Sequence, residues 1–161
     1  MSQICAIAGF GTGVSMSVAK AFGKEGYTLA LIACSRAKLE ENAQELKANY
    51  NVHLFAADAA DEVSLIQAFT NIRAELGDPE VLIYNAFAAT PGTPSSLDAK
   101  VLIADFHVNV VGALIAVQQV QSSNASKPKG NNSLDWRRIS FKSGCRCLIV
   151  GYWQRWYPHS V

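Results

Sequence analysis

The sequence predicts an α/β protein whose parallel strands form a doubly wound sheet, incomplete at about four strands, with helices on both faces. Short apolar runs, typical of buried parallel strands, alternate with segments whose apolar residues recur at the helical period. Glycines or helix-capping residues separate most of these segments. A chain of 161 residues has room for one domain with one core.

The expected strands are short and rich in aliphatic residues, at positions 3–8, 28–33, 52–57 and 81–84. The expected helices begin near capping residues and end near glycine or polar residues, at positions 14–26, 36–50, 61–77 and about 97–120. Parallel strands joined by right-handed helical crossovers stack as a doubly wound sheet.

Charge divides the chain into two parts. Residues 1–120 carry seven Lys or Arg against twelve Asp or Glu, whereas residues 121–161 carry seven against one. The second part holds all three tryptophans and lacks strand or helix periodicity. Residues 1–120 are therefore predicted to form the α/β half-domain, and 121–161 a disordered tail that does not belong to it. The edge of residues 81–84 would then lack a neighbouring strand.

Composition excludes several classes of protein. Half of the residues are hydrophobic and the net charge is +1, as in soluble globular proteins. No apolar run approaches the length that spans a bilayer, and the start Met1-Ser2-Gln3 lacks the charged segment of a signal peptide. The four cysteines show neither disulfide nor zinc spacing. We expect a cytoplasmic protein with no metal site and with neither membrane nor nucleic acid as partner.

A glycine cluster follows the first expected strand and reads Ala8-Gly9-Phe10-Gly11-Thr12-Gly13-Val14-Ser15. Glycines there let the backbone approach a pyrophosphate, and the N-terminus of the following helix offers free N–H groups. A tight turn between strand and helix would also explain the glycines. The spacing resembles the T-G-x-x-x-G-x-G pattern of short-chain dehydrogenases, with Ala8 for the threonine and Ser15 for the last glycine. The resemblance implies a Rossmann-type fold and cofactor contacts from Gly9, Gly11, Thr12, Gly13 and Val14.

The end of the second expected strand bears on the cofactor. An NAD enzyme carries a carboxylate there, which binds the ribose hydroxyls. This chain has Ala33-Cys34-Ser35-Arg36 instead, and a hydroxyl with a guanidinium suits the 2′-phosphate of NADP. The alternative is that Ser35 only caps the helix and that Arg36 is a solvated residue. NADP is therefore the predicted cofactor.

Three further segments resemble the short-chain dehydrogenase family. Asp58 and Ala59 follow the third expected strand and resemble the family's motif that binds the adenine amino group, although Asp58 also suits a helix cap. Asn85 and Ala86 match the central residues of the N-N-A-G motif beside the adenine ribose. Asn109 resembles the asparagine of the catalytic tetrad, and an asparagine among apolar neighbours needs partners for its amide.

The resemblance stops near Val120. The family places a tyrosine and a lysine four residues apart in the following segment, where the tyrosine moves a proton. Here no lysine follows a tyrosine by four residues beyond Asn109. A reading-frame slip explains this, because Trp136, Trp153 and Trp156 each become glycine one base further on, in segments that then resemble the family. A basic module that contacts phosphates is the rival interpretation of the tail.

These observations predict an NADP-dependent oxidoreductase by ancestry. Its intact parent, the enzyme without the reading-frame slip, transfers hydride between nicotinamide and a carbonyl or alcohol substrate. The parent is compatible with an oligomer. The chain as given is predicted to be inactive, because the catalytic serine, tyrosine and lysine are missing. A non-enzymatic nucleotide-binding or regulatory protein is the alternative. A methyltransferase that uses S-adenosylmethionine would want a carboxylate after the second strand, which is absent.

Overall fold

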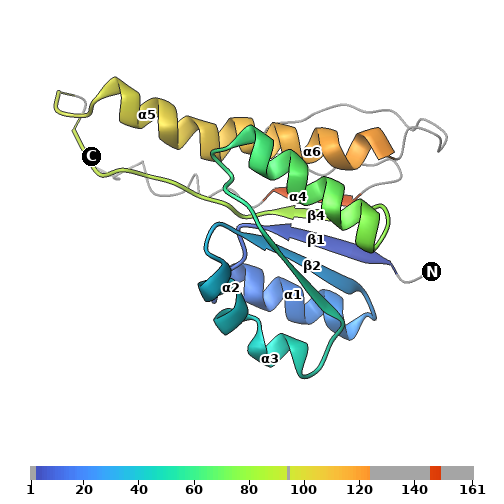
Figure 1. The fold of residues 1–161 in the computed structure, drawn as a ribbon. Helices are drawn as coiled ribbons and strands as arrows, with labels where there is room; N and C mark the ends of the chain where they lie inside the picture. The colour runs from blue at the N-terminus through green and yellow to red at the C-terminus, as the bar shows by residue number, and fades with distance from the viewer. Residues whose placement is uncertain (1–2, 94, 124–145, 150–161) are drawn as a thin grey trace, which may run out of the picture.

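The computed structural model describes residues 3–93, 95–123 and 146–149. Its centre is a parallel sheet in the order β3-β2-β1-β4-β5 (Figure 1). The sheet consists of the strands β1 (Ile4–Ala8), β2 (Thr28–Ala33), β3 (Val52–Ala56), β4 (Val81–Tyr84) and β5 (Arg146–Ile149). The chain places β2 and β3 on one side of β1 and then β4 and β5 on the other, so the strand order switches after β3. This switch confirms the predicted doubly wound class.

The fifth strand corrects one prediction. Arg146–Ile149 pairs in parallel with β4, from Val81 opposite Arg146 to Tyr84 opposite Ile149. The edge of β4 is therefore covered, and not open as the sequence suggested. The tail contains the apolar run Cys147-Leu148-Ile149-Val150, and an exposed edge can pair with any extended segment through its backbone groups. Residues 121–123, which the prediction assigned to the disordered tail, belong to the helix Gly112–Ser123, and residues 124–145 and 150–161 of that tail lie outside the described part of the chain.

Helices cover both faces of the sheet (Figure 1). One face carries α1 (Val14–Lys24), α2 (Arg36–Asn42) and α3 (Gln44–Lys47), and the other carries α4 (Glu62–Glu75), α5 (Ala99–Phe106) and α6 (Gly112–Ser123). The helix expected at 36–50 is interrupted at Ala43, whose backbone flattens to a ψ of −5° while its side chain stays buried. Each face buries its own apolar cluster, so the sheet is a rigid platform for the loops at its carboxyl edge.

The last described helical segment is longer than the others and contains an irregular turn. A π-helical turn, η1 (His107–Val111), joins α5 to α6. The combined helix Ala99–Gln121 is long and apolar enough to cross a membrane by length and composition, contrary to the expectation that no such segment exists. Its α6 part buries Ala113, Ala116 and Val120 in the core, which is also how the core helix of a globular protein behaves.

Candidate functional site

The turn after β1 brings three glycines together, and packing explains the first of them. Gly9 has a φ of +79°, which favours glycine. A Cβ built on it would lie 2.2 Å from the Ala86 nitrogen and 2.6 Å from the Asn85 carbonyl carbon. Gly9 therefore lets the turn after β1 lie directly against the backbone that leaves β4. A ligand is not needed to explain this glycine.

The other two glycines face open space. A Cβ on Gly11 or Gly13 would meet no atom within 4 Å among those around it. Thr12 between them is exposed. Beyond them, Met16 N donates to the Gly13 carbonyl, whereas Val14 N and Ser15 N donate to no acceptor in the described part of the chain. Open glycines next to free N–H groups at the N-terminus of α1 form a site that suits a phosphate group.

Ser15 holds the turn in shape, a role that the sequence comparison did not suggest. Its side chain is 1% exposed, and its hydroxyl accepts from Gly11 N at 2.9 Å and donates to Gly11 O at 3.2 Å. The residue that replaces the family's last glycine thus ties down the middle of the loop. A hydroxyl four residues after a loop glycine, in the first turn of a helix, is the signal that points to such a bond.

Asn85 joins the ends of β1 and β4. Its backbone N–H donates to the Ala8 carbonyl at 2.8 Å, and its side-chain Nδ2 donates to the Gly9 carbonyl at 3.4 Å. Ala86 lies with its backbone against Gly9. The predicted pair Asn85 and Ala86 is thereby placed beside the predicted glycine turn.

The end of β2 carries the predicted phosphate ligands. Ser35 caps α2, and its hydroxyl accepts from Lys38 N at 3.4 Å. The Arg36 guanidinium donates from Nε to Glu40 Oε1 at 2.7 Å and from Nη1 to the Leu54 carbonyl at 3.0 Å. Because a guanidinium has five N–H groups, three remain for a ligand. The alternative role of Ser35 as a cap is observed, and a capping hydroxyl can still donate its own proton.

Asp58 and Ala59 form the turn after β3. Asp58 Oδ1 accepts from Ala60 N at 2.9 Å, while the cap of α4 is Asp61, whose Oδ1 accepts from Val63 N at 3.0 Å. The alternative that Asp58 caps the next helix is therefore wrong. Its second carboxylate oxygen accepts no hydrogen bond in the described part of the chain and is available to a ligand.

Asn109 lies in η1 and is bonded to the loop after β4. Its Oδ1 accepts from Ala88 N at 3.0 Å, and its Nδ2 donates to Ala88 O at 2.6 Å. Both ends of the amide are thus engaged with a single residue of the loop, as expected for an asparagine among apolar neighbours. This pair of bonds fixes the distance between η1 and the carboxyl end of β4.

Tyr84 explains why the helix is irregular at this point. It is 1% exposed, and its hydroxyl donates to the Val108 carbonyl at 2.5 Å, inside η1. Burial, together with the charge of Asp58, raises the pKa of Tyr84 well above its usual value, so the hydroxyl keeps its proton. A side chain that bonds to a helix carbonyl disturbs the regular helical ladder at that point, and a wider turn accommodates this.

Gly112 makes room for this contact. A Cβ there would lie 2.5 Å from both the Tyr84 hydroxyl and the Ala59 carbonyl oxygen. The turn after β3, the end of β4 and the start of α6 therefore converge on one glycine. The sequence analysis identified neither Tyr84 nor Gly112 as a site residue. At the position of Tyr84, the family motif has an asparagine.

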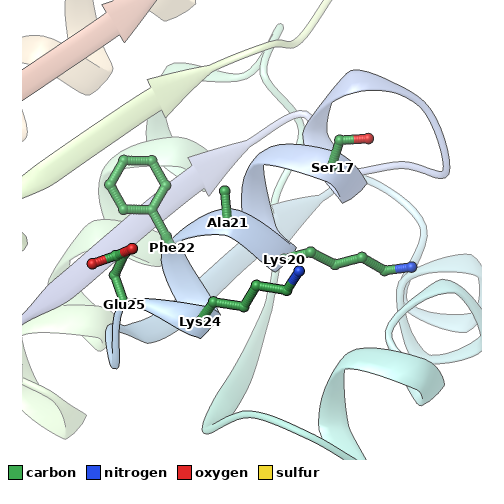
Figure 2. Close-up of a pocket in the computed structure, with 6 residues that line it drawn as sticks. All are labelled: Ser17, Lys20, Ala21, Phe22, Lys24 and Glu25. Carbon is green, nitrogen blue, oxygen red and sulfur yellow. The ribbon is translucent and has the colours of Figure 1, made fainter.

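The described surface also has a hollow of about 420 Å³ on the flank of α1. Figure 2 shows its lining, in which Lys20 and Lys24 extend from the helix on the side away from Phe22. Lys20 is paired with Glu45 at 2.6 Å. None of the predicted site residues lines this hollow. The predicted residues instead gather at the carboxyl ends of β1, β2, β3 and β4, where doubly wound sheets bind their ligands.

A family model described as short chain dehydrogenase matches residues 3–131. The chain belongs to the short-chain dehydrogenase family. The match runs from the first described residue past Val120, where the motif resemblance stops, and includes every predicted site residue. Membership makes the protein an oxidoreductase by ancestry, with a nicotinamide dinucleotide as the family's cofactor.

Relatives and solved structures agree with this assignment. Over 130 residues, the chain is 26% identical to 17-beta-hydroxysteroid dehydrogenase 13 of Rattus norvegicus, covering 80% of this chain and 43% of the relative. It is 28% identical to 2-(S)-hydroxypropyl-CoM dehydrogenase 3 of Xanthobacter autotrophicus, in a match that covers 80% of this chain and 51% of the relative. The chain thus spans about half the length of the curated relatives that it matches.

The short-chain dehydrogenase/reductase from Serratia marcescens has 26% sequence identity and a TM-score of 0.70, over 75% of this chain and 50% of that one. An alcohol dehydrogenase from the archaeon Thermococcus sibiricus, complexed with 5-hydroxy-NADP, shares the fold with a TM-score of 0.71 and 24% identity. This match covers 76% of this chain and 53% of that one.

Proposed function

We propose that this protein binds NADP(H) in preference to NAD(H), at the carboxyl edge of its sheet. The observation that carries the proposal is Arg36, which offers three N–H groups at the end of β2, where Ala33-Cys34-Ser35 supplies no carboxylate. A guanidinium can bind two phosphate oxygens at once. The Leu54 carbonyl and Glu40 already hold the guanidinium, so part of the entropic cost of ordering it is met before the ligand arrives.

The other predicted residues fit the rest of a dinucleotide. The open glycines Gly11 and Gly13, with the N–H groups of Val14 and Ser15, suit the pyrophosphate. In this proposal Asp58 binds the adenine amino group through its unengaged oxygen, and Asn85 and Ala86 border the adenine ribose. When bound, the cofactor supplies or accepts hydride, with a carbonyl or alcohol as substrate in the intact parent.

We also propose that the chain as given binds the dinucleotide without turning over a substrate. Every group described above precedes Val120, whereas no lysine follows a tyrosine by four residues after Asn109. The reading-frame slip is the proposed cause. Sequencing the coding DNA around Val120 tests it, and a shifted frame that is rich in stop codons, or unlike a dehydrogenase, would refute it.

Calorimetric titration of the full chain with NADP⁺ and NAD⁺ tests the cofactor assignment. We expect tighter binding of NADP⁺. Replacing Arg36 with Asp should weaken NADP⁺ binding about 10- to 100-fold, the range that the loss of charge-assisted hydrogen bonds implies. Lys38→Gln, a change to an exposed cation on the same helix, is the matched control and should have little effect. Equal or tighter binding of NAD⁺ by the unaltered protein would overturn the assignment.

A further inference from the structure

A carboxylate reaches the end of β2 after all, from one helical turn away. Glu40 lies four residues after Arg36, and its Oε1 accepts from Arg36 Nε at 2.7 Å. The two side chains are 52% and 56% exposed, respectively, so both remain accessible to a ligand. The segment Ala33-Cys34-Ser35 contains no acid, so the fold supplies the only carboxylate that the described residues place against Arg36.

We propose that Glu40 is a specificity-determining residue that weakens the preference of this site for NADP(H), because its charge opposes the 2′-phosphate that Arg36 attracts. This inference rests on the proposed function, since it needs a dinucleotide whose 2′ group approaches Arg36.

The electrostatic argument compares two ligands. The 2′-phosphate carries between one and two negative charges near neutral pH, whereas the 2′-hydroxyl of NAD(H) carries none. Arg36 and Glu40 together have no net charge, so a phosphate bound to the guanidinium gains attraction from one and repulsion from the other. The Arg36 hydrogen bond and charge lower the pKa of Glu40, which therefore stays ionised near neutral pH. The ribose of NAD(H) carries no phosphate, so the attraction by Arg36 and the repulsion by Glu40 are both weaker for it than for the 2′-phosphate.

Glu40 is not the only group that keeps Arg36 in place. The Leu54 carbonyl of the edge strand β3 accepts from Nη1 at 3.0 Å, independently of Glu40. A glutamine at position 40 would retain an oxygen that accepts from Nε while losing the charge. Glu40→Gln therefore separates the charge from the positioning of the guanidinium.

Titrating the full-length Glu40→Gln variant with NADP⁺ and NAD⁺ tests the inference. We expect NADP⁺ to bind about three- to tenfold more tightly than to the unaltered protein, as expected from removing one charge near the phosphate at moderate ionic strength. NAD⁺ binding should change by less than about twofold, because its ribose carries no charge. Raising the salt concentration should shrink the gain.

Two controls make the outcome specific. Glu41→Gln removes the same charge from the neighbouring exposed position, which makes no ion pair with Arg36, and should give a smaller gain. In an Arg36→Gln background, Glu40→Gln should leave the ratio of NADP⁺ to NAD⁺ affinity nearly unchanged. The inference is overturned if Glu40→Gln weakens NADP⁺ binding, leaves it unchanged or shifts both cofactors equally. Failure of the unaltered protein to favour NADP⁺ would refute the proposed function first, and the inference with it.

Discussion

The loop after β1 and the segment after β4 contribute to the same edge of the sheet, but different forces hold them. The first loop is shaped by its backbone: Gly9 permits a close approach, and one hydroxyl, from Ser15, ties the middle. The second is held by side chains, because Asn109 binds the loop through Ala88 and Tyr84 binds η1 through Val108. A site made of backbone groups leaves a glycine pattern in the sequence, whereas the contact from Tyr84 to η1 leaves no pattern of spacing.

The two segments also meet. Gly9 lies against the backbone of Asn85 and Ala86, closer than any side chain would allow. The bonds from Asn85 to Ala8 and Gly9 close the same junction. A change at the junction should therefore affect both segments, whereas a change within either should affect mainly that one. Substitutions can test this division.

The largest effect is expected for Gly9→Ala. The added Cβ would lie 2.2 Å from the Ala86 nitrogen, and the φ of +79° is strained for alanine. Because backbone atoms on both sides cannot move independently, we expect the free energy of unfolding to fall by about 3–5 kcal/mol, or the chain not to fold. Denaturant unfolding followed by circular dichroism measures this. A loss below about 1 kcal/mol would show that the junction yields easily.

A somewhat smaller loss is expected for Gly112→Ala, within the second segment. Its Cβ would lie 2.5 Å from the Tyr84 hydroxyl and from the Ala59 carbonyl oxygen. The tyrosine can shift slightly, so we expect a loss of about 2–4 kcal/mol in the free energy of unfolding. The double variant Gly112→Ala with Tyr84→Phe should lose less than the sum of the single changes, since the hydroxyl no longer obstructs the methyl group. Strict additivity would contradict the proposed contact.

A loss of about 1–2 kcal/mol is expected for Tyr84→Phe, because the Val108 carbonyl loses its donor while the packing is retained. Tyr27→Phe is the control, since the Tyr27 hydroxyl has no hydrogen-bond partner in the described part of the chain and should matter little. Amide hydrogen exchange should also quicken at Ala88, because η1 holds that loop through Asn109. If the exchange rate at Ala88 does not change, the Tyr84 hydrogen bond does not stabilise the loop.

The sequence was sufficient for those features that depend on periodicity and on glycine. Strands β2 and β4 begin and end where the apolar runs predicted, and the helix expected at 61–77 is capped at its first predicted residue, Asp61. The helix break at Ala43 and the π turn were not predictable, because both occur inside continuous helical patterns and depend on tertiary contacts. The fifth strand was missed since four apolar residues in a basic, aperiodic tail carry too little signal.

The same distinction applies to the site. The glycine turn, Asn85 and Asn109 were identified from spacing within a family pattern, and the structure brings the first two together. Tyr84 could not be identified, since the family pattern has a different residue at that position. Glu40 was missed for a geometric reason: one helical turn separates it from Arg36 in sequence, and only the helix brings the two charges into contact.

The smallest effect on stability, and the sharpest contrast within the first loop, is expected for Gly11→Ala. A Cβ at this position meets no atom within 4 Å, and the φ of Gly11 is not positive. The free energy of unfolding should therefore change by no more than about 0.5 kcal/mol, or rise slightly because alanine restricts the unfolded chain. Yet the methyl group would enter the space through which we propose that the pyrophosphate approaches. We expect NADP⁺ binding to weaken by about tenfold or more, as contacts to the loop N–H groups are lengthened. Gly9→Ala should show the reverse, because its main effect is on the free energy of unfolding and not on NADP⁺ binding. If Gly11→Ala leaves both stability and NADP⁺ affinity unchanged, the pyrophosphate does not bind over Gly11, and the open glycines serve only the turn.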